Sequence, residues 1–165
     1  MAIIALLSGP NLNLLGVREP EIYGTATLDD HVETAQKTAS RFRLDFEHFQ
    51  SNHEGELVDE IHRNRDRWDG IVINPAALTH YGWSLHDALA AFEGPIIELH
   101  LSNPNTRESW RHVSVVAPVA TGSIIGLGGH GYCLAVEALA HELGVSKWRR
   151  FYRLPTNQSV QDTDG

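Results

Sequence analysis

The sequence predicts an α/β domain in which five parallel strands form one sheet with helices on both faces. Segments of strand length alternate five times with segments of helical periodicity along the 165 residues. Alternation of this kind is typical of parallel sheets, because each parallel connection needs a crossover that is usually a helix. The length is that of a single domain with one sizeable core.

Short apolar segments mark the predicted strands. Most are continuous apolar runs, such as AIIALLS at residues 2–8, while LDFEHFQS at 44–51 alternates apolar and polar residues. Parallel strands are covered on both faces, so continuous apolar runs fit buried positions in such a sheet. The predicted strands span residues 2–8, 44–51, 70–74, 95–101 and 121–127.

The intervening segments carry helix signals. Thr27 is placed to cap a helix that runs to about Arg41, with Asp29 and Asp30 in its first turn. The remaining predicted helices span residues 54–68, 81–92 and 131–144. The histidines at 31, 48, 62, 86 and 141 are assigned to the surface. We assign residues 1–146 to one catalytic domain and residues 147–165 to a C-terminal extension whose end we expect to be disordered.

Composition limits the possible partners and the compartment. The net charge of −8 argues against a nucleic-acid or anionic-membrane surface, although local arginines can still bind an anionic small molecule. A single cysteine, Cys133, cannot form an internal disulfide, which fits a reducing compartment. The apolar opening lacks a basic segment and ends at Gly9-Pro10, so it is interpreted as a strand and not as a signal peptide. We therefore expect a cytoplasmic protein.

Polar side chains follow three of the predicted strands. In an open parallel sheet, ligands bind beyond the carboxyl ends of the strands, where the strand order reverses. Each residue also has a plain structural interpretation: Asn11 could cap a short helix, and Glu98 with His100 could form a structural pair. The residues at these strand ends are Asn11, Asn74, His80, Glu98, His100, Ser102 and Asn103.

A loop near the N-terminus adds an arginine and a tyrosine to the same edge. GVREPEIYG, residues 16–24, follows the first strand and holds Arg18 and Tyr23 between two glycines. A nearby guanidinium stabilises a phenolate, so Arg18 could convert Tyr23 into a base that removes a proton next to a carbonyl. An asparagine could hold the resulting enolate, and a carboxylate-oriented histidine could protonate a leaving hydroxyl. This pattern indicates elimination or isomerisation of an oxygen-rich, anionic substrate.

Two other patterns carry less weight. GLGGHG, residues 126–131, matches the dinucleotide-binding spacing, but no strand follows it, so we assign its glycines to close helix–sheet packing. Lys37 and Lys147 are the only lysines, and neither lies near a strand end. Schiff-base chemistry is therefore not expected.

The chain resembles the type II 3-dehydroquinate dehydratases. GPNLNLLGVREPEIYG, QSNHEGELVDEIH, INPAALTH, ELHLSN and GLGGHGY occur in the order and spacing of that family. The resemblance implies a flavodoxin-like three-layer sandwich with a five-stranded parallel sheet, assembled as a dodecamer of four trimers. It implies anti elimination of water from 3-dehydroquinate through an enolate, without metal or organic cofactor, in the shikimate pathway or in quinate catabolism.

The resemblance also assigns roles. Tyr23 would accept the proton, Arg18 would activate it, and His100 would donate a proton. Asn11 would stabilise the enolate, and Glu98 would orient His100. The substrate would be bound by Asn74, His80, Arg111 and the backbone amides of Leu101 and Ser102, with Asp87 completing the site of a neighbouring subunit.

The chain departs from the family pattern near the predicted site. Ala76 stands where glycine is usual, THYGW replaces the common THTS, and SNPNTRESWRH differs from the usual sequence after the fourth strand. The same residues are compatible with two other functions. One is a non-catalytic module that binds an anionic metabolite. The other is a metal-dependent hydrolase using His80, His100 and Glu98.

Overall fold

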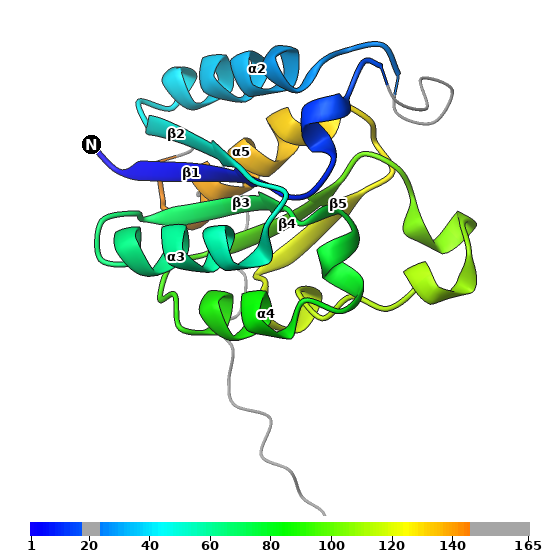
Figure 1. Cartoon of the computed structure of the whole chain (residues 1–165). Coiled ribbons are helices and arrows are strands. Elements are labelled where there is room, and N and C mark those ends of the chain that lie inside the picture. Colours follow the sequence, from blue (N-terminus) through cyan, green and yellow to red (C-terminus); the bar gives the residue numbers. More distant parts are fainter. Residues whose placement is uncertain (18–23, 146–165) are drawn as a thin grey trace, which may run out of the picture.

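A computed structural model describes residues 1–17 and 24–145. Five parallel strands form one sheet in the order β2-β1-β3-β4-β5, which confirms the predicted fold class (Figure 1). The order reverses at β1, whose two neighbours in the sheet are β2 and β3. The strands are β1 (Ile3–Ser8), β2 (Asp45–Gln50), β3 (Gly70–Asn74), β4 (Ile96–His100) and β5 (Gly122–Ile125).

Within the described residues, four α-helices cover the sheet in two layers. Helices α2 (Leu28–Arg41) and α5 (His130–Glu142) pack on one face, with Val72 and Leu99 of the sheet in their core. Helices α3 (Glu54–Asn64) and α4 (Trp83–Ala90) pack on the other face (Figure 1). Short 3-10 turns lie in the connections: η1 (Leu12–Leu14), η2 (Ala76–His80), η3 (Pro104–Thr106), η4 (Ser109–Arg111) and η5 (Ala117–Val119).

Helix α2 begins where the sequence predicts. The Thr27 side chain accepts a hydrogen bond from the backbone N–H of Asp30, and the Asp30 carboxylate accepts one from the backbone N–H of Thr27. This reciprocal arrangement satisfies two amides that the first turn of a helix leaves unpaired. Hydrogen bonds from the backbone and side chain of Thr27 lower the pKa of Asp30.

Helix α3 is shorter than the predicted segment 54–68. It ends at Asn64, and the backbone N–H groups of Arg67 and Trp68 both bond to the Asn64 carbonyl in a tight turn. The turn delivers Asp69 to the start of β1, where its N–H donates to the Ile3 carbonyl. Trp68 is nevertheless buried, and its indole N–H donates to Glu47 at 2.8 Å. The apolar spacing that predicted a longer helix arises because Trp68 still packs in the core after the helix has ended.

One glycine of GLGGHG, Gly131, allows close helix–sheet packing as expected, whereas a Cβ atom on Gly128 would meet nothing within 4 Å. A Cβ atom on Gly131 would lie 2.7 Å from the Leu99 side chain, so only glycine lets α5 approach β4 this closely. No helix within residues 1–17 and 24–145 is both long and apolar enough to cross a membrane.

The assignment of His31 to the surface is wrong. Its side chain is buried and stacks on Tyr132, with the ring centroids 4.9 Å apart and the planes 9° from parallel. Its Nε2 atom has no hydrogen-bond partner among the described residues. Burial lowers the pKa of His31, although the charge of Asp30 opposes the shift.

We expect His31→Phe to stabilise the protein. Removing a buried polar atom without a partner should raise the free energy of unfolding by about 1 kcal/mol, while the aromatic ring keeps the stack on Tyr132. Because the unfolded chain binds a proton on His31 at higher pH than the folded chain, His31 costs stability as the pH falls through about 6.5. Urea unfolding at fixed protein concentration should therefore show a larger gain at pH 5 than at pH 7. A loss of stability at both values would contradict the interpretation.

Candidate active site

A pocket opens beyond the carboxyl ends of β1, β3 and β4, at the edge where the strand order reverses. Its volume is about 120 Å³. Parallel topology brings these strand ends together although they are separated along the chain. The lining residues that the sequence analysis named are Asn11, Asn74, Ala76, His80, His100, Leu101, Ser102 and Arg111.

Asn11 reaches the pocket through an unusual backbone conformation. It precedes η1 with a φ angle of +65°, in the left-handed region that asparagine tolerates better than most residues. It occupies the N-cap position of η1, as the helix-cap interpretation predicts, but its side chain makes no capping hydrogen bond. Its backbone N–H instead donates to the Asn52 side chain at 2.8 Å. The Asn11 amide is thus left for the pocket.

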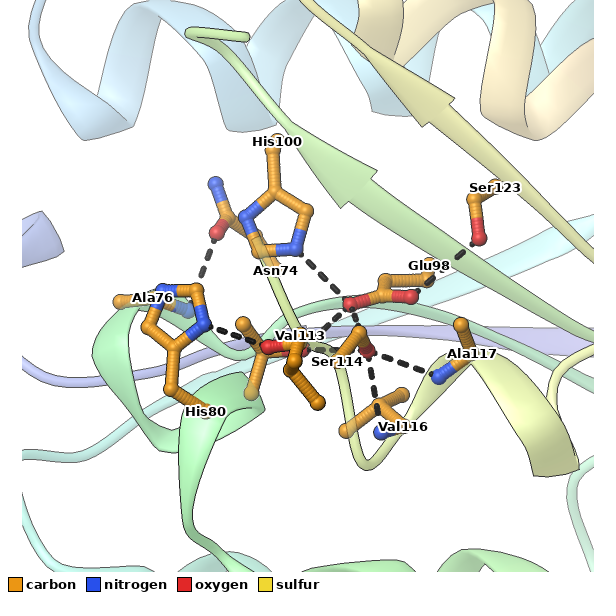
Figure 2. A network of polar contacts seen from close by, with 11 residues as sticks. Asn74, Ala76, His80, Glu98, His100, Val113, Ser114, Val116, Ala117 and Ser123 are labelled. Carbon is orange, nitrogen blue, oxygen red and sulfur yellow. Dashed lines mark hydrogen bonds and ion pairs between the residues drawn. The ribbon is translucent and has the colours of Figure 1, made fainter. Parts of the chain in front are cut away.

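His100 and Glu98 form a close pair at the end of β4. Nε2 of His100 lies 2.8 Å from Oε1 of Glu98, and their side chains are 11% and 2% exposed. The two residues are two apart in a strand and therefore lie on the same face of the sheet. Because the carboxylate occupies Nε2, the other ring nitrogen, Nδ1, is the one directed away from Glu98 (Figure 2).

Three hydroxyl groups surround the Glu98 carboxylate. Thr79 donates to Oε1 at 2.5 Å. Ser114 donates to Oε1 at 2.9 Å, and Ser123 donates to Oε2 at 3.2 Å (Figure 2). Ser114 also accepts hydrogen bonds from the N–H groups of Val116 and Ala117, which directs its own proton to Glu98. Four donors, counting His100, thus converge on one buried carboxylate.

These donors keep Glu98 ionised. Burial by itself raises the pKa of Glu98, but the hydrogen bonds from His100, Thr79 and Ser114 outweigh burial and hold the pKa below its usual value. The hydrogen bond to this ionised carboxylate fixes the orientation of the His100 imidazole. It leaves Nδ1 of His100 as the ring nitrogen that can exchange a proton with a molecule in the pocket.

His80 and Arg111 form another wall of the pocket. Nδ1 of His80 lies 2.7 Å from the carbonyl oxygen of Val113, which can only accept, so this nitrogen carries hydrogen. Nε2 of a neutral His80 is then an acceptor for a substrate hydroxyl. Nε of Arg111 donates to Glu108 at 2.8 Å, so the guanidinium group is held at this nitrogen.

The chain is similar to known proteins over most of its length. The family model described as dehydroquinase class II matches residues 2–140. The chain belongs to the class II dehydroquinase family. A 3-dehydroquinate dehydratase of Bacillus licheniformis is 52% identical over 137 residues, covering 83% of this chain and 94% of the relative. A catabolic 3-dehydroquinase of Aspergillus clavatus is 53% identical over 137 residues, covering 83% and 91%.

A solved structure supports the same family membership. The type II dehydroquinase from Propionibacterium acnes superposes with a TM-score of 0.82 at 44% identity, covering 86% of this chain and 97% of that one. The class II dehydroquinase fold therefore accounts for almost all of the described residues.

Not all of the predicted residues can be placed in the pocket. Arg18 and Tyr23 lie outside the described residues. Asp87, on α4, lies outside the pocket of its own chain. Asn74 is 3% exposed, and its side-chain oxygen accepts from the N–H of Ala76 (Figure 2).

Sequence reasoning missed four polar residues around the site. Thr79, Ser114 and Ser123 hold Glu98, and Arg107 lines the pocket beside Arg111. Ser123 faces Glu98 because β5 pairs with β4 in a register that places the two side by side, and sequence patterns do not reveal that register. Arg107 was detectable, since it lies in the segment that follows β4.

The geometry does not group the proposed metal ligands. No cluster of three or more histidine, cysteine or acidic side chains that could hold a metal ion occurs within the described ranges. His100 and His80 instead direct one nitrogen each to Glu98 and to the Val113 carbonyl. His80, Glu98 and His100 line one hollow together, but Nε2 of His100 contacts Glu98 itself and Nδ1 of His80 contacts a backbone carbonyl.

Ala76, where the sequence departs from the family pattern, has a backbone conformation that favours glycine. Ala76 has a φ angle of +51°, in the left-handed region where a Cβ atom is unfavourable. We expect Ala76→Gly to raise the free energy of unfolding by about 1 kcal/mol by relieving this strain, after allowing for the entropy of glycine. Chemical denaturation measures this change. A destabilised variant with unchanged activity would show that the position is not strained.

Proposed function

We propose that this protein catalyses the anti elimination of water from 3-dehydroquinate to give 3-dehydroshikimate. One observation carries the proposal: the His100–Glu98 pair, which can act as an acid, and a wall with arginine side chains that can bind an anion lie at the same pocket. Family membership adds the reaction, since its relatives are named 3-dehydroquinate dehydratases. Two arginines, Arg107 and Arg111, provide local positive charge despite the acidic chain.

The reaction begins with removal of a proton from the carbon next to the ketone. We assign this step to the Tyr23 phenolate, stabilised by Arg18. The C–H electron pair becomes the enolate, whose oxygen is stabilised by the Asn11 amide, directly or through water. No residue forms a covalent bond to the substrate in this scheme.

The second step expels the hydroxyl group. As the enolate collapses, the carbon–oxygen bond breaks, and the proton on Nδ1 of His100 is transferred to the leaving oxygen to form water. Glu98 stabilises the imidazolium before the transfer and keeps the ring oriented. His80, Arg111, Asn74 and the backbone of Leu101 and Ser102 bind the hydroxyl and carboxylate groups of the substrate.

A spectroscopic assay tests the function. The product is a conjugated enone, so ultraviolet absorbance should rise when the protein is mixed with 3-dehydroquinate. Turnover should continue after chelator treatment and after borohydride treatment in the presence of substrate, because the scheme uses neither a metal nor an imine. Well-folded protein that binds 3-dehydroquinate without an absorbance rise would support the metabolite-binding alternative instead. Sensitivity to chelator would support the hydrolase.

We also propose a cytoplasmic homo-oligomer, with a dodecamer of four trimers as the expected form. Tyr81 and Trp83 are 60% and 63% exposed and lie close in sequence to Asp87, which we expect to complete the site of a neighbouring subunit. Exposed aromatic side chains of this size favour protein–protein contact. Light scattering should report twelve chains, or three at minimum. A stable, fully active monomer would contradict this assembly.

A further inference from the structure

Trp110 contacts two pocket residues without lining the pocket itself. It lies in η4, immediately before Arg111. Its ring makes an edge contact with His80, with centroids 5.2 Å apart and planes at 85°. The guanidinium carbon of Arg111 lies 4.0 Å from the centroid of the same ring. One indole thus touches side chains that come from two separate connections of the fold.

Each of these pocket residues is otherwise anchored at a single nitrogen in the described contacts. His80 is held through Nδ1 by the Val113 carbonyl, and Arg111 is held through Nε by Glu108. A side chain held at one atom can still turn about that bond. The indole provides a second contact on each, and two contacts fix the direction of the imidazole Nε2 and of the guanidinium.

Burial alone does not account for a tryptophan at this position. Trp110 is 53% exposed, so much of the apolar surface that would stabilise the fold remains in water. Its electron-rich face instead lies against a cation, and its ring lies against an imidazole. A guanidinium over a tryptophan face is attracted by the ring quadrupole, most strongly for tryptophan among the aromatic residues.

We propose that Trp110 is a positioning residue that fixes the relative placement of His80 and Arg111 in the substrate pocket. The inference rests on the proposed function, in which these two side chains bind substrate hydroxyls. His80 Nε2 presents an acceptor and Arg111 presents donors, and the indole sets the separation between them. This separation favours a ligand with oxygen groups at a matching spacing, such as a ring polyol.

Steady-state kinetics of Trp110→Leu test this role. Loss of the aromatic face should raise KM for 3-dehydroquinate about five- to tenfold and change kcat less than about threefold, because substrate positioning is lost while the acid–base groups remain. Trp110→Phe keeps an aromatic face and should restore KM to within about threefold of the unmodified protein. Equal KM values for all three proteins, or a Leu variant that loses kcat alone, would overturn the proposal.

A double-mutant comparison separates positioning from general destabilisation. If Trp110 acts partly through Arg111, Trp110→Leu should raise KM by a smaller factor in an Arg111→Ala background. The control is Arg63→Ala on α3, which removes an arginine paired with Glu60 outside the pocket. In that background the factor should be unchanged. Equal factors in the two backgrounds would contradict action through Arg111.

Nitrogen-15 spectra of the histidine side chains supply a readout that does not need turnover. Trp110→Leu should move the His80 ring signals and leave those of His86, which contacts Trp83, in place. Unmoved His80 signals would contradict the proposal. If the unmodified protein shows no turnover of 3-dehydroquinate but the His80 signals move, the proposed function fails and the contact between Trp110 and His80 stands.

Discussion

Tyr23→Phe should abolish nearly all turnover of 3-dehydroquinate while the fold stays intact. Loss of a general base lowers kcat by about 10²- to 10⁴-fold, and phenylalanine has no group that can accept the proton. The structure argues against another tyrosine, Tyr132, as the base. Tyr132 is fully buried, and burial raises the pKa of its phenol to about 12. Tyr132 is therefore unsuited to act as the base.

Arg18→Ala is the companion experiment to Tyr23→Phe. Lowering a phenol pKa by two units needs roughly 2.7 kcal/mol of preferential interaction with the phenolate, which a nearby guanidinium can supply. Without the cation the phenol ionises at higher pH, so the variant should be slow near neutrality and recover partly in alkaline buffer. The measurement is kcat against pH for the variant and the unmodified protein.

Two outcomes would contradict the assignment of an arginine-activated base. One is a Tyr23→Phe variant with substantial activity. The other is an Arg18→Ala variant whose pH profile matches that of the unmodified protein. Circular dichroism serves as the control for folding. The sequence around these residues is bounded by Gly16 and Gly24, whose φ angles of +84° and +80° fit glycine.

His100→Gln should cause the second large loss. The leaving hydroxyl would then depart without a proton donor, so we expect kcat to fall about 10²- to 10⁴-fold with a much smaller change in KM. Glu98→Gln keeps the shape of the side chain but removes its negative charge, so we expect a smaller loss of about 10- to 100-fold. Steady-state kinetics with 3-dehydroquinate give both values.

A double variant tests whether Glu98 acts through His100. If Glu98 acts through His100, the His100→Gln/Glu98→Gln double variant should be little slower than His100→Gln alone. Fully multiplicative losses would mean that Glu98 acts independently of His100. A Glu98→Gln variant that keeps full activity, with its fold confirmed, would leave the pair with a structural role only.

Much of the fold and of the site is predictable from the sequence because the strongest signals are local. Five strand-length segments predicted the parallel sheet, and Thr27 predicted the start of α2. The positions of the strand ends predicted that Asn11, Asn74, His80 and His100 lie at one pocket. What escaped depends on contacts between distant segments. His31 has the sequence environment of a surface histidine, and only the packing of α2 against α5 reveals that it stacks on Tyr132.

The hydroxyl groups around Glu98 were unpredictable for the same reason. Thr79, Ser114 and Ser123 come from three different connections or strands, and strand register decides which hydroxyl faces the carboxylate. The end of α3 escaped because Trp68 continues the apolar spacing after the backbone has turned. A pattern of apolar residues indicates which side chains are buried. It does not indicate where the helical backbone ends.

In the proposed mechanism the base and the acid act on opposite faces of the substrate. This arrangement is tested most directly with 3-dehydroquinate that carries deuterium stereospecifically at the carbon between the ketone and the leaving hydroxyl. Mass spectrometry of the 3-dehydroshikimate then reports which hydrogen was removed. We predict loss of the hydrogen trans to the leaving hydroxyl and retention of the cis hydrogen. Loss of the cis hydrogen would contradict the placement of Tyr23 and His100 on opposite sides of the bound substrate.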